Sequence, residues 1–432
     1  MNKIVASVGL VALSASGLQA AVPGLTSDAS KPWSVSASLR GFYDDNVNTS
    51  PSGPNKRDTF GFEVSPAVNL SFPMEQTTIS LGYIYAFKYY DRKPIGNSDN
   101  YDQTHTLNAA LDHAFSERYQ ISVRDSFAIG QEPDFLRTGN SFATFQRISG
   151  NNIRNYGSVT LNAQLTRLFG LEVGYSNSYF DYEDEGGDAT SPSLSGLLDR
   201  IEHTAHIDAR WVLQPQTVGV FGYQFRQANY TGNEEIGVTS SLASVMSRDR
   251  DFREHYVYVG VDHTFRPDLT GSVRVGGRYI EFYNDPTGNG NGWGPYAVAN
   301  LRWTYAPESY VELGLSHDIN ATDVVGGGTD QSSFTSSAES TVVYGSVHHR
   351  FTPKLHGSLL GQFQNSEWSG GSFNGQTEQY YLIGLNLTYQ FTPHFSGEVG
   401  YNYDKLVSVK GTDGSDRSFD RNRVYIGVTA SY

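Results

Sequence analysis

Apolar and polar residues alternate with a period of two through most of this sequence, from Ser34 onward. Between Ile79 and Tyr89 every second residue is large and apolar or aromatic, and the residues between them are mostly small or polar, with Ile84 as the exception. A period of two predicts β-strands with one apolar and one more polar face. The runs last about 12 to 15 residues, whereas a strand that crosses a bilayer at a tilt needs about 9–11. The sequence therefore predicts membrane-spanning strands.

Two kinds of connection alternate along the chain between these strands. Short turns such as 266–268 and 392–394 are followed by longer connections rich in Gly, Asn, Ser and Asp. Eight short turns and nine long connections join 18 strands, and an error of one hairpin would give 16 or 20. Short periplasmic turns and longer extracellular loops are typical of outer-membrane barrels. The long connections are expected near residues 46–57, 93–101, 132–150, 184–198, 233–249, 285–293, 324–338, 369–377 and 411–419.

The composition favours a closed barrel over a soluble globule. The 432 residues include 28 Tyr and 24 Phe but no Cys, and the mean hydropathy is negative. In hydrocarbon every backbone donor and acceptor must be paired within the protein, so a spanning sheet closes on itself. Its outer face is then apolar, its aromatic residues gather at the interfaces, and at about 18 strands side chains no longer fill the interior. We therefore expect an all-β, antiparallel transmembrane β-barrel of about 18 strands.

The two ends of the chain carry targeting signals. A short basic start, the apolar run Ile4–Leu13 and a small-residue cleavage site predict a signal peptide over residues 1–20. Residues 21–33 are then a periplasmic segment and residues 34–432 a single barrel domain; an ordinary periplasmic or secreted protein is the alternative. The last strand ends at Tyr432 in the apolar phase, which resembles the signal read by the barrel-assembly machinery. We predict the outer membrane of a Gram-negative bacterium, with lipid, lipopolysaccharide and that machinery as partners.

A glycine recurs near the start of the strands that follow short turns, between two apolar or aromatic residues. We expect these glycines to point inward and to relieve crowding where the barrel wall curves. A repeated β-blade, as in a propeller, is the alternative, but propeller strands are much shorter. The recurring triplets are Leu81-Gly82-Tyr83, Val173-Gly174-Tyr175, Phe221-Gly222-Tyr223, Leu313-Gly314-Leu315 and Val399-Gly400-Tyr401.

The opening of the first strand carries a family resemblance. Gly41-Phe42-Tyr43-Asp44-Asp45-Asn46-Val47, followed by Ser50-Pro51 and a strand that begins at Asp58, resembles the start of the putative beta-barrel porin 2 family. The signal peptide and the hairpin rhythm of the whole chain agree with this resemblance. It implies an outer-membrane barrel with porin activity, and the family has no agreed catalytic or binding residues. Some relatives occur in settings of exopolysaccharide export, so the alternative is a non-conducting or accessory barrel that serves export or envelope structure.

Charges of both signs occupy the polar phase of the strands in nearly equal number. Opposite charges across a pore order water, and a balanced set predicts weak ion selectivity. The alternative is that these charges merely pair along the wall and solvate it. The residues expected to line the pore are Arg40, Lys88, Asp112, Arg124, Asp208, Arg210, Arg226, Asp262, Arg274, Arg278, Arg302 and Arg350.

The third long connection, residues 132–150, is unusually apolar for a loop. Phe135, Leu136, Phe142 and Phe145 lie in it among charged residues, although loops seldom expose four large apolar groups to water. One hypothesis is a constriction loop that folds inward and narrows the pore. The alternative is that the flanking strands extend above the membrane.

Several functions are excluded or disfavoured. A formal net charge of −14 argues against nucleic acid as a partner, and a chain without Cys has neither a thiolate metal site nor a cysteine nucleophile. We expect no cofactor and no metal, because the histidines belong to different hairpins. We also expect no enzyme, although His206 and Asp208 share the inward phase and could touch. The predicted function is a porin-like channel for passive diffusion of small hydrophilic solutes.

Overall fold

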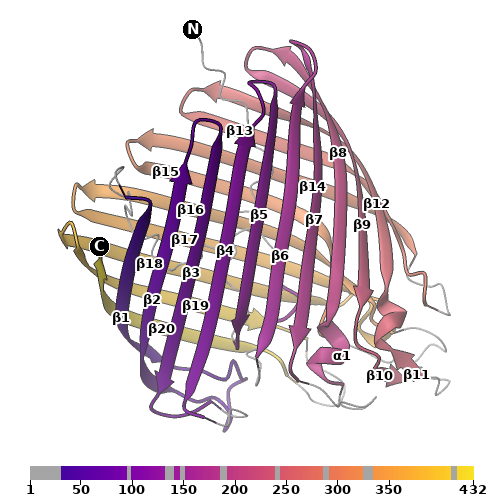
Figure 1. The fold of residues 1–432 in the computed structure, drawn as a ribbon. Coiled ribbons are helices and arrows are strands. Elements are labelled where there is room, and N and C mark those ends of the chain that lie inside the picture. The colour runs from indigo at the N-terminus through magenta and orange to yellow at the C-terminus, as the bar shows by residue number, and fades with distance from the viewer. Residues whose placement is uncertain are drawn as a thin grey trace.

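The computed structural model describes residues 31–94, 99–131, 141–145, 151–184, 192–238, 244–285, 291–324, 334–409 and 416–432. The signal peptide and most of the predicted periplasmic segment lie outside these residues. Eighteen long antiparallel strands make one sheet that closes into a barrel (Figure 1), as predicted. They are β1 (Trp33–Asp44), β2 (Thr59–Pro73), β3 (Thr77–Tyr90), β4 (Tyr101–Ala114), β5 (Tyr119–Gly130), β6 (Asn152–Gln164), β7 (Phe169–Tyr182), β8 (Arg200–Gln214), β9 (Thr217–Tyr230), β12 (Phe252–Arg266), β13 (Leu269–Glu281), β14 (Gly292–Ala306), β15 (Ser309–Asn320), β16 (Ser337–Thr352), β17 (Leu355–Ser369), β18 (Thr377–Thr392), β19 (Phe395–Val407) and β20 (Phe419–Ser431).

The barrel closes between its first and last strands. Each strand pairs with its neighbours in the chain, β9 pairs with β12, and β1 pairs with β20 from Ser36–Ser431 to Asp44–Arg423. Closure leaves no free sheet edge at this join, which is the condition for strands to cross hydrocarbon. Among the described residues, no helix is long and apolar enough to span a membrane.

The alternation of residues decides which side chains face outward. In β18 the odd-numbered residues Tyr381, Ile383 and Leu385 are exposed, and the even-numbered residues between them are buried. The same pattern recurs around the barrel, so a continuous apolar surface faces outward, where lipid takes the place of a protein core. This arrangement confirms the predicted phase of the strands.

The connections separate the two ends of the barrel. Eight short turns lie at one end together with both chain ends of the barrel domain, and the nine long connections lie at the other, as predicted. The long connections hold the small elements of the fold, and the three that Figure 1 labels lie at one end of the barrel. These are α1 (Leu194–Leu198), β10 (Glu235–Val238), β11 (Ser244–Met246), η1 (Ser247–Arg250) and η2 (Gly371–Phe373).

Candidate functional site in the barrel lumen

The twelve charged residues predicted to line the interior lie on the strand face opposite the exposed apolar residues. In β13, Arg274 and Arg278 alternate with Val273 and Val275, which are 42% and 48% exposed on the outer surface. The other ten share this inward face on their own strands: Arg40, Lys88, Asp112, Arg124, Asp208, Arg210, Arg226, Asp262, Arg302 and Arg350.

Carboxylates accompany these arginines closely. Arg210 Nη2 lies 2.8 Å from Asp262 Oδ2, and Arg274 Nη1 lies 2.7 Å from Asp262 Oδ1. Glu172 lies 3.5 Å from Arg210 Nη1. Because opposite charges a few Å apart largely cancel at longer range, such clusters project little net field into the lumen. Further ion pairs on the inner face are Arg40 with Glu398 and Glu63, Arg124 with Asp112, Arg226 with Glu254, Arg302 with Glu312, and Arg423 with Asp404.

The five recurring glycines point inward, and each is covered by a side chain from a neighbouring strand. A Cβ atom on Gly222 would overlap the ring of Tyr258, its direct partner in the sheet, and one on Gly314 would overlap the ring of Tyr344. This is a different reason for glycine than wall curvature, because the space is used by a neighbouring ring. The remaining pairs are Gly82 with Asn69, Gly174 with His206 and Gly400 with Tyr425.

These glycines make the covering tyrosines lie flat against the wall. Tyr258 of β12 crosses Gly222 of β9, and its hydroxyl donates to Asp208 of β8 at 2.6 Å. Tyr344 of β16 crosses β15 in the same way and donates to Asn300 of β14 at 2.7 Å. Each ring thus spans one whole strand along the sheet and does not project into the interior. The glycine joints, as we call these pairs, keep bulky rings out of the lumen.

The described part of the third long connection, residues 141–145, packs on the wall opposite its own strands. This connection joins β5 to β6, yet Phe145 is buried against Tyr380 of β18, with ring centroids 4.6 Å apart. The Phe142 amide donates to Gln364 of β17 at 3.0 Å, and the Gln364 amide donates back to the Phe142 carbonyl at 3.2 Å. The other two predicted loop residues, Phe135 and Leu136, lie outside the described residues. The described part of the loop therefore occupies the extracellular mouth of the barrel.

A buried arginine ties three other connections together in the same mouth. Arg250, at the end of η1, is fully buried and donates to the carbonyls of Thr322, Val324 and Thr335 at 2.7–2.9 Å, and to Leu197 of α1 at 3.4 Å. A buried guanidinium must satisfy its donors within the protein, so these carbonyls bind the loops to one centre. This centre leaves no signal in the sequence, because any residue type can supply a backbone carbonyl.

The loops also form a small apolar core of their own. Leu197 and Leu198 of α1 pack with Ile236 of β10, Val245 of β11 and Phe334. Asp323 joins this assembly to the third connection, because its amide donates to the carbonyl of Ala143 at 3.2 Å, and its carboxylate accepts two hydrogen bonds from Arg417 at 2.8 Å. The mouth is therefore held by apolar packing and by buried polar contacts.

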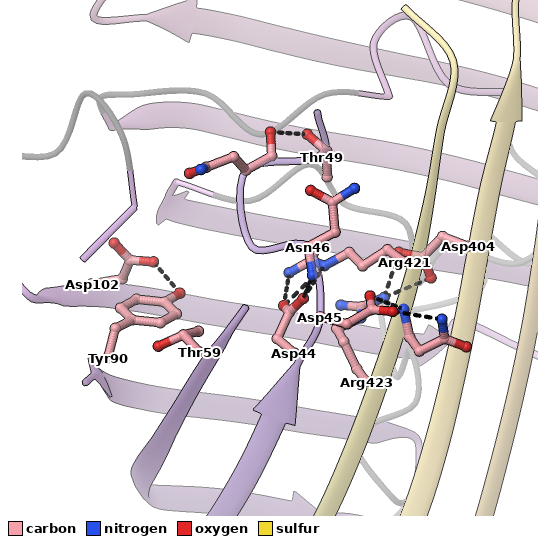
Figure 2. Close-up of polar contacts among 12 residues, drawn as sticks. Asp44, Asp45, Asn46, Thr49, Thr59, Tyr90, Asp102, Asp404, Arg421 and Arg423 are labelled. Carbon is pink, nitrogen blue, oxygen red and sulfur yellow. Dashed lines mark hydrogen bonds and ion pairs between the residues drawn. The ribbon is translucent and has the colours of Figure 1, made fainter. Parts of the chain in front are cut away.

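The motif that carries the family resemblance fastens the barrel where it closes (Figure 2). Asp44 accepts hydrogen bonds from Arg421 of β20, at 2.9 Å from Nε, and both side chains are fully buried. Asp45 accepts from the backbone and side-chain amides of Asn422 at 2.7 and 2.8 Å. The Asn46 amide group donates to the carbonyl of Asp420 at 2.9 Å. Three consecutive residues of the motif thus bind the last strand.

The inward histidine and aspartate that could have suggested catalysis are engaged in the wall. His206 lies over Gly174, with its Nε2 atom 3.6 Å from Glu172, and Asp208 accepts the hydrogen bond from Tyr258. Within the described ranges no group of three or more His, Asp or Glu residues could hold a metal ion. The two residues therefore belong to the glycine joints.

One family model covers almost the whole chain that the structure describes. Residues 34–432 match the family model described as "Putative beta-barrel porin 2". Similar solved structures include the outer membrane protein opdK from Pseudomonas aeruginosa (11% identity, 93% of this chain and 99% of that chain, TM-score 0.42) and OccAB3 from Acinetobacter baumannii (10%, 93% and 99%, 0.45). OccK2 (OpdF) of P. aeruginosa, solved with glucuronate, matches with 11% identity over 92% of this chain and 98% of that chain, at a TM-score of 0.45. No curated protein matches the sequence.

Proposed function

Because the chain belongs to the putative beta-barrel porin 2 family, we propose that it is an outer-membrane channel through which small hydrophilic solutes diffuse passively. The observation that carries this conclusion is the closed barrel of 18 strands, apolar outside and polar inside. Such a wall presents lipid with an apolar surface and gives a solute a polar path that avoids hydrocarbon.

The lumen favours solutes by size more than by charge. The inner arginines are paired with carboxylates, and the pair Arg124–Asp112 remains open to the interior, with side chains 40% and 49% exposed. A solute passing this wall meets both signs of charge at once. We therefore expect similar permeability for small cations and anions, as the nearly equal numbers of positive and negative charges on the inner face predict.

The third connection is the constriction in this proposal. Phe142 and Phe145 reach the opposite wall through packing and two hydrogen bonds, which is support for an inward-folded loop. The same packing favours the second candidate, an accessory barrel that does not conduct freely, because a mouth held by a small core could stay shut.

Lipopolysaccharide and the barrel-assembly machinery complete the proposed partners. The final strand supports the second of these, because its outward residues Val424, Ile426 and Val428 are exposed and apolar. Tyr432 lies beside Trp33, with ring centroids 5.8 Å apart, so the terminal aromatic sits on the outer surface at the closing strands. An assembly factor that reads this strand would find its apolar face accessible.

Planar-bilayer recordings of the purified protein test the proposal. A steadily open channel, a zero-current potential near zero in a KCl gradient, and conductance reduced by neutral sugars that enter the lumen are expected for a weakly selective pore. The double variant Phe142→Ala/Phe145→Ala should raise the single-channel conductance, whereas Phe115→Ala, in a short turn at the other end, should not. A folded barrel that is electrically silent would favour the accessory role instead.

A further inference from the structure

A carboxylate interrupts the apolar outer surface of the barrel in the middle of β5. Asp125 has the outward phase of its strand, because Val123, two residues below it, pairs with Val159 of β6, which is 37% exposed on the outer surface. On the extracellular side of Asp125 the outward residues are apolar again, namely Phe127 and Ile129. Asp125 therefore lies inside the apolar band and not above it.

Other charges on the outer face are placed differently. Every other Asp, Glu, Lys or Arg with the outward phase in the described strands lies within three residues of the extracellular end of its strand, where headgroups and water can reach it. These residues are Asp181, Arg253, Glu281, Glu339, Glu367, Lys405 and Asp420. Asp125 lies near the middle of a strand of 12 residues, where the medium is hydrocarbon and a charged side chain is costly. Its position therefore calls for a compensating contact.

The neighbouring strand compensates the carboxylate only in part. The Nδ2 atom of Asn155 in β6 donates to the two carboxylate oxygens of Asp125, at 2.9 and 3.0 Å. A carboxylate can accept about four hydrogen bonds, and the amide of Asn155 carries no countercharge. Acyl chains offer neither a donor nor a charge, so this pair is poorly satisfied when it faces lipid alone.

More polar groups continue the same row across β6, β7 and β8, which lie side by side (Figure 1). Gly157 is the register partner of Asp125 on one side and of Asn177 on the other. Asn177 pairs in turn with His203, whose Nδ1 atom lies 3.2 Å from the Asn177 amide nitrogen. We call Asp125, Asn155, Asn177 and His203 the polar island.

The centre of the polar island has no side chain. A Cβ atom on Gly157 would meet its first neighbour, an oxygen of Asp125, only at 3.9 Å, so the backbone of β6 is open to the outside at this point. Glycine within a strand often marks a place where another backbone approaches closely. A second protein wall could therefore come near to the polar groups of the island.

We propose that the polar island is the contact surface between two copies of this chain in the outer membrane, related by a twofold axis along the membrane normal. Asp125 and Asn155 are in contact, so they lie at nearly the same depth. A twofold axis brings identical surfaces together at equal depth, and it can set the acceptor of each copy beside the donor of the other. The amide group of Asn155 has two N–H donors, so it can hold its own aspartate and also bind the aspartate of the second copy. The inference concerns the outer face and does not depend on whether the barrel conducts.

Single cysteines test this contact, because the chain has no cysteine of its own. Gly157→Cys places a thiol in the polar island. Gly361→Cys is the matched control, since Gly361 is an outward glycine within β17, has no atom within 4 Å of its Cβ position, and has the exposed apolar residues Leu359 and Ile383 as neighbours. Intact outer membranes are treated with a mild oxidant or a short bifunctional thiol reagent, and the products are separated on non-reducing gels. The mass of the unmodified protein is measured in parallel by native mass spectrometry in detergent.

We expect a cross-linked dimer from Gly157→Cys in severalfold higher yield than from Gly361→Cys, and a native mass of two copies. Adding Asp125→Leu and Asn155→Leu to Gly157→Cys should lower the yield to that of the control, with circular dichroism confirming that the barrel still folds. Equal yields at the two glycines, or a native mass of one or three copies, would overturn the proposal. A cross-linked product whose mass is not twice that of the chain would show that a different protein occupies the island. A yield that survives the two leucines would show that the polar groups do not make the contact.

Discussion

The ion pair at the closing join offers a direct test of how the barrel is stabilised. Asp44 and Arg421 are both fully buried, and Asp44 accepts from two nitrogens of the guanidinium. In Asp44→Asn the buried cation loses its countercharge, and removing one partner of a buried pair costs about 3–5 kcal/mol. The matched control is Asp58→Asn, which breaks the exposed pair with Arg92, whose side chain is 62% exposed. Pairs of that kind contribute about 0–1 kcal/mol.

The assay is urea unfolding of the barrel refolded into lipid vesicles, with circular dichroism to confirm that each variant folds. We expect Asp44→Asn to lose several-fold more unfolding free energy than Asp58→Asn. The double variant Asp44→Leu/Arg421→Met should recover much of the loss, because it removes both buried charges together. Equal effects of the two single variants, or a loss for Asp44→Asn of less than about 1 kcal/mol, would refute the idea that the family motif fastens the closure.

Three further outcomes follow from the lumen and its mouth. Gly314→Val should displace the Tyr344 ring into the interior and lower single-channel conductance, whereas Gly361→Ala, with open space around its Cβ, should not; equal conductance in both would reject the glycine joint. Arg250→Met should leave buried carbonyls unpaired, so proteolysis of the mouth loops should speed up severalfold with the barrel intact, and unchanged cleavage would contradict this role. Burial raises the pKa of Asp199 to about 6, so its folded surroundings hold a proton more tightly than an unfolded chain does. The tighter proton binding stabilises the folded loop fully below the ordinary pKa of about 4, and this contribution is lost as pH rises through 6. Hydrogen exchange in α1, corrected for intrinsic rates, should therefore be slower at pH 5 than at pH 7.5. Asp199→Asn should abolish the difference.

The barrel could be predicted from the sequence because its signals are local. A period of two is visible within one strand, and the turn residues that separate strands lie beside them in the chain. Counting the strands and turns therefore gave the number of strands and showed which end of the barrel carries the short turns. The inward phase of Arg274 or Asp262 followed in the same way. The glycine motif was also visible, but its reason was not, because Gly222 and Tyr258 are 36 residues apart (258 − 222) and their register is a property of the sheet.

The mouth could not be predicted because its contacts are long-range and have no pattern. Arg250 binds carbonyls that lie between 53 and 85 residues away, and any residue type can supply a carbonyl. Ile319 departs from the alternation of its strand: its position assigns it to the outer face, yet it is 5% exposed and packs with Phe252 and Ile280. Phe142 and Phe145 could be singled out from the sequence, because large apolar residues are unusual in a loop.

The wall and the mouth of the barrel differ in the contacts that their side chains make. Along the wall, arginines lie against carboxylates and tyrosines lie flat over glycines, so the lining exerts little net field and adds little steric bulk. In the mouth, by contrast, loops from several hairpins meet around Arg250 and Phe145. For the proposed channel we therefore expect the main obstacle to a solute to lie in the mouth, before the charged lining. On this proposal, neutralising a single lining residue such as Arg210 should change permeability little, because its charge is already paired, whereas displacing the packed residues Phe142 and Phe145 should change it strongly.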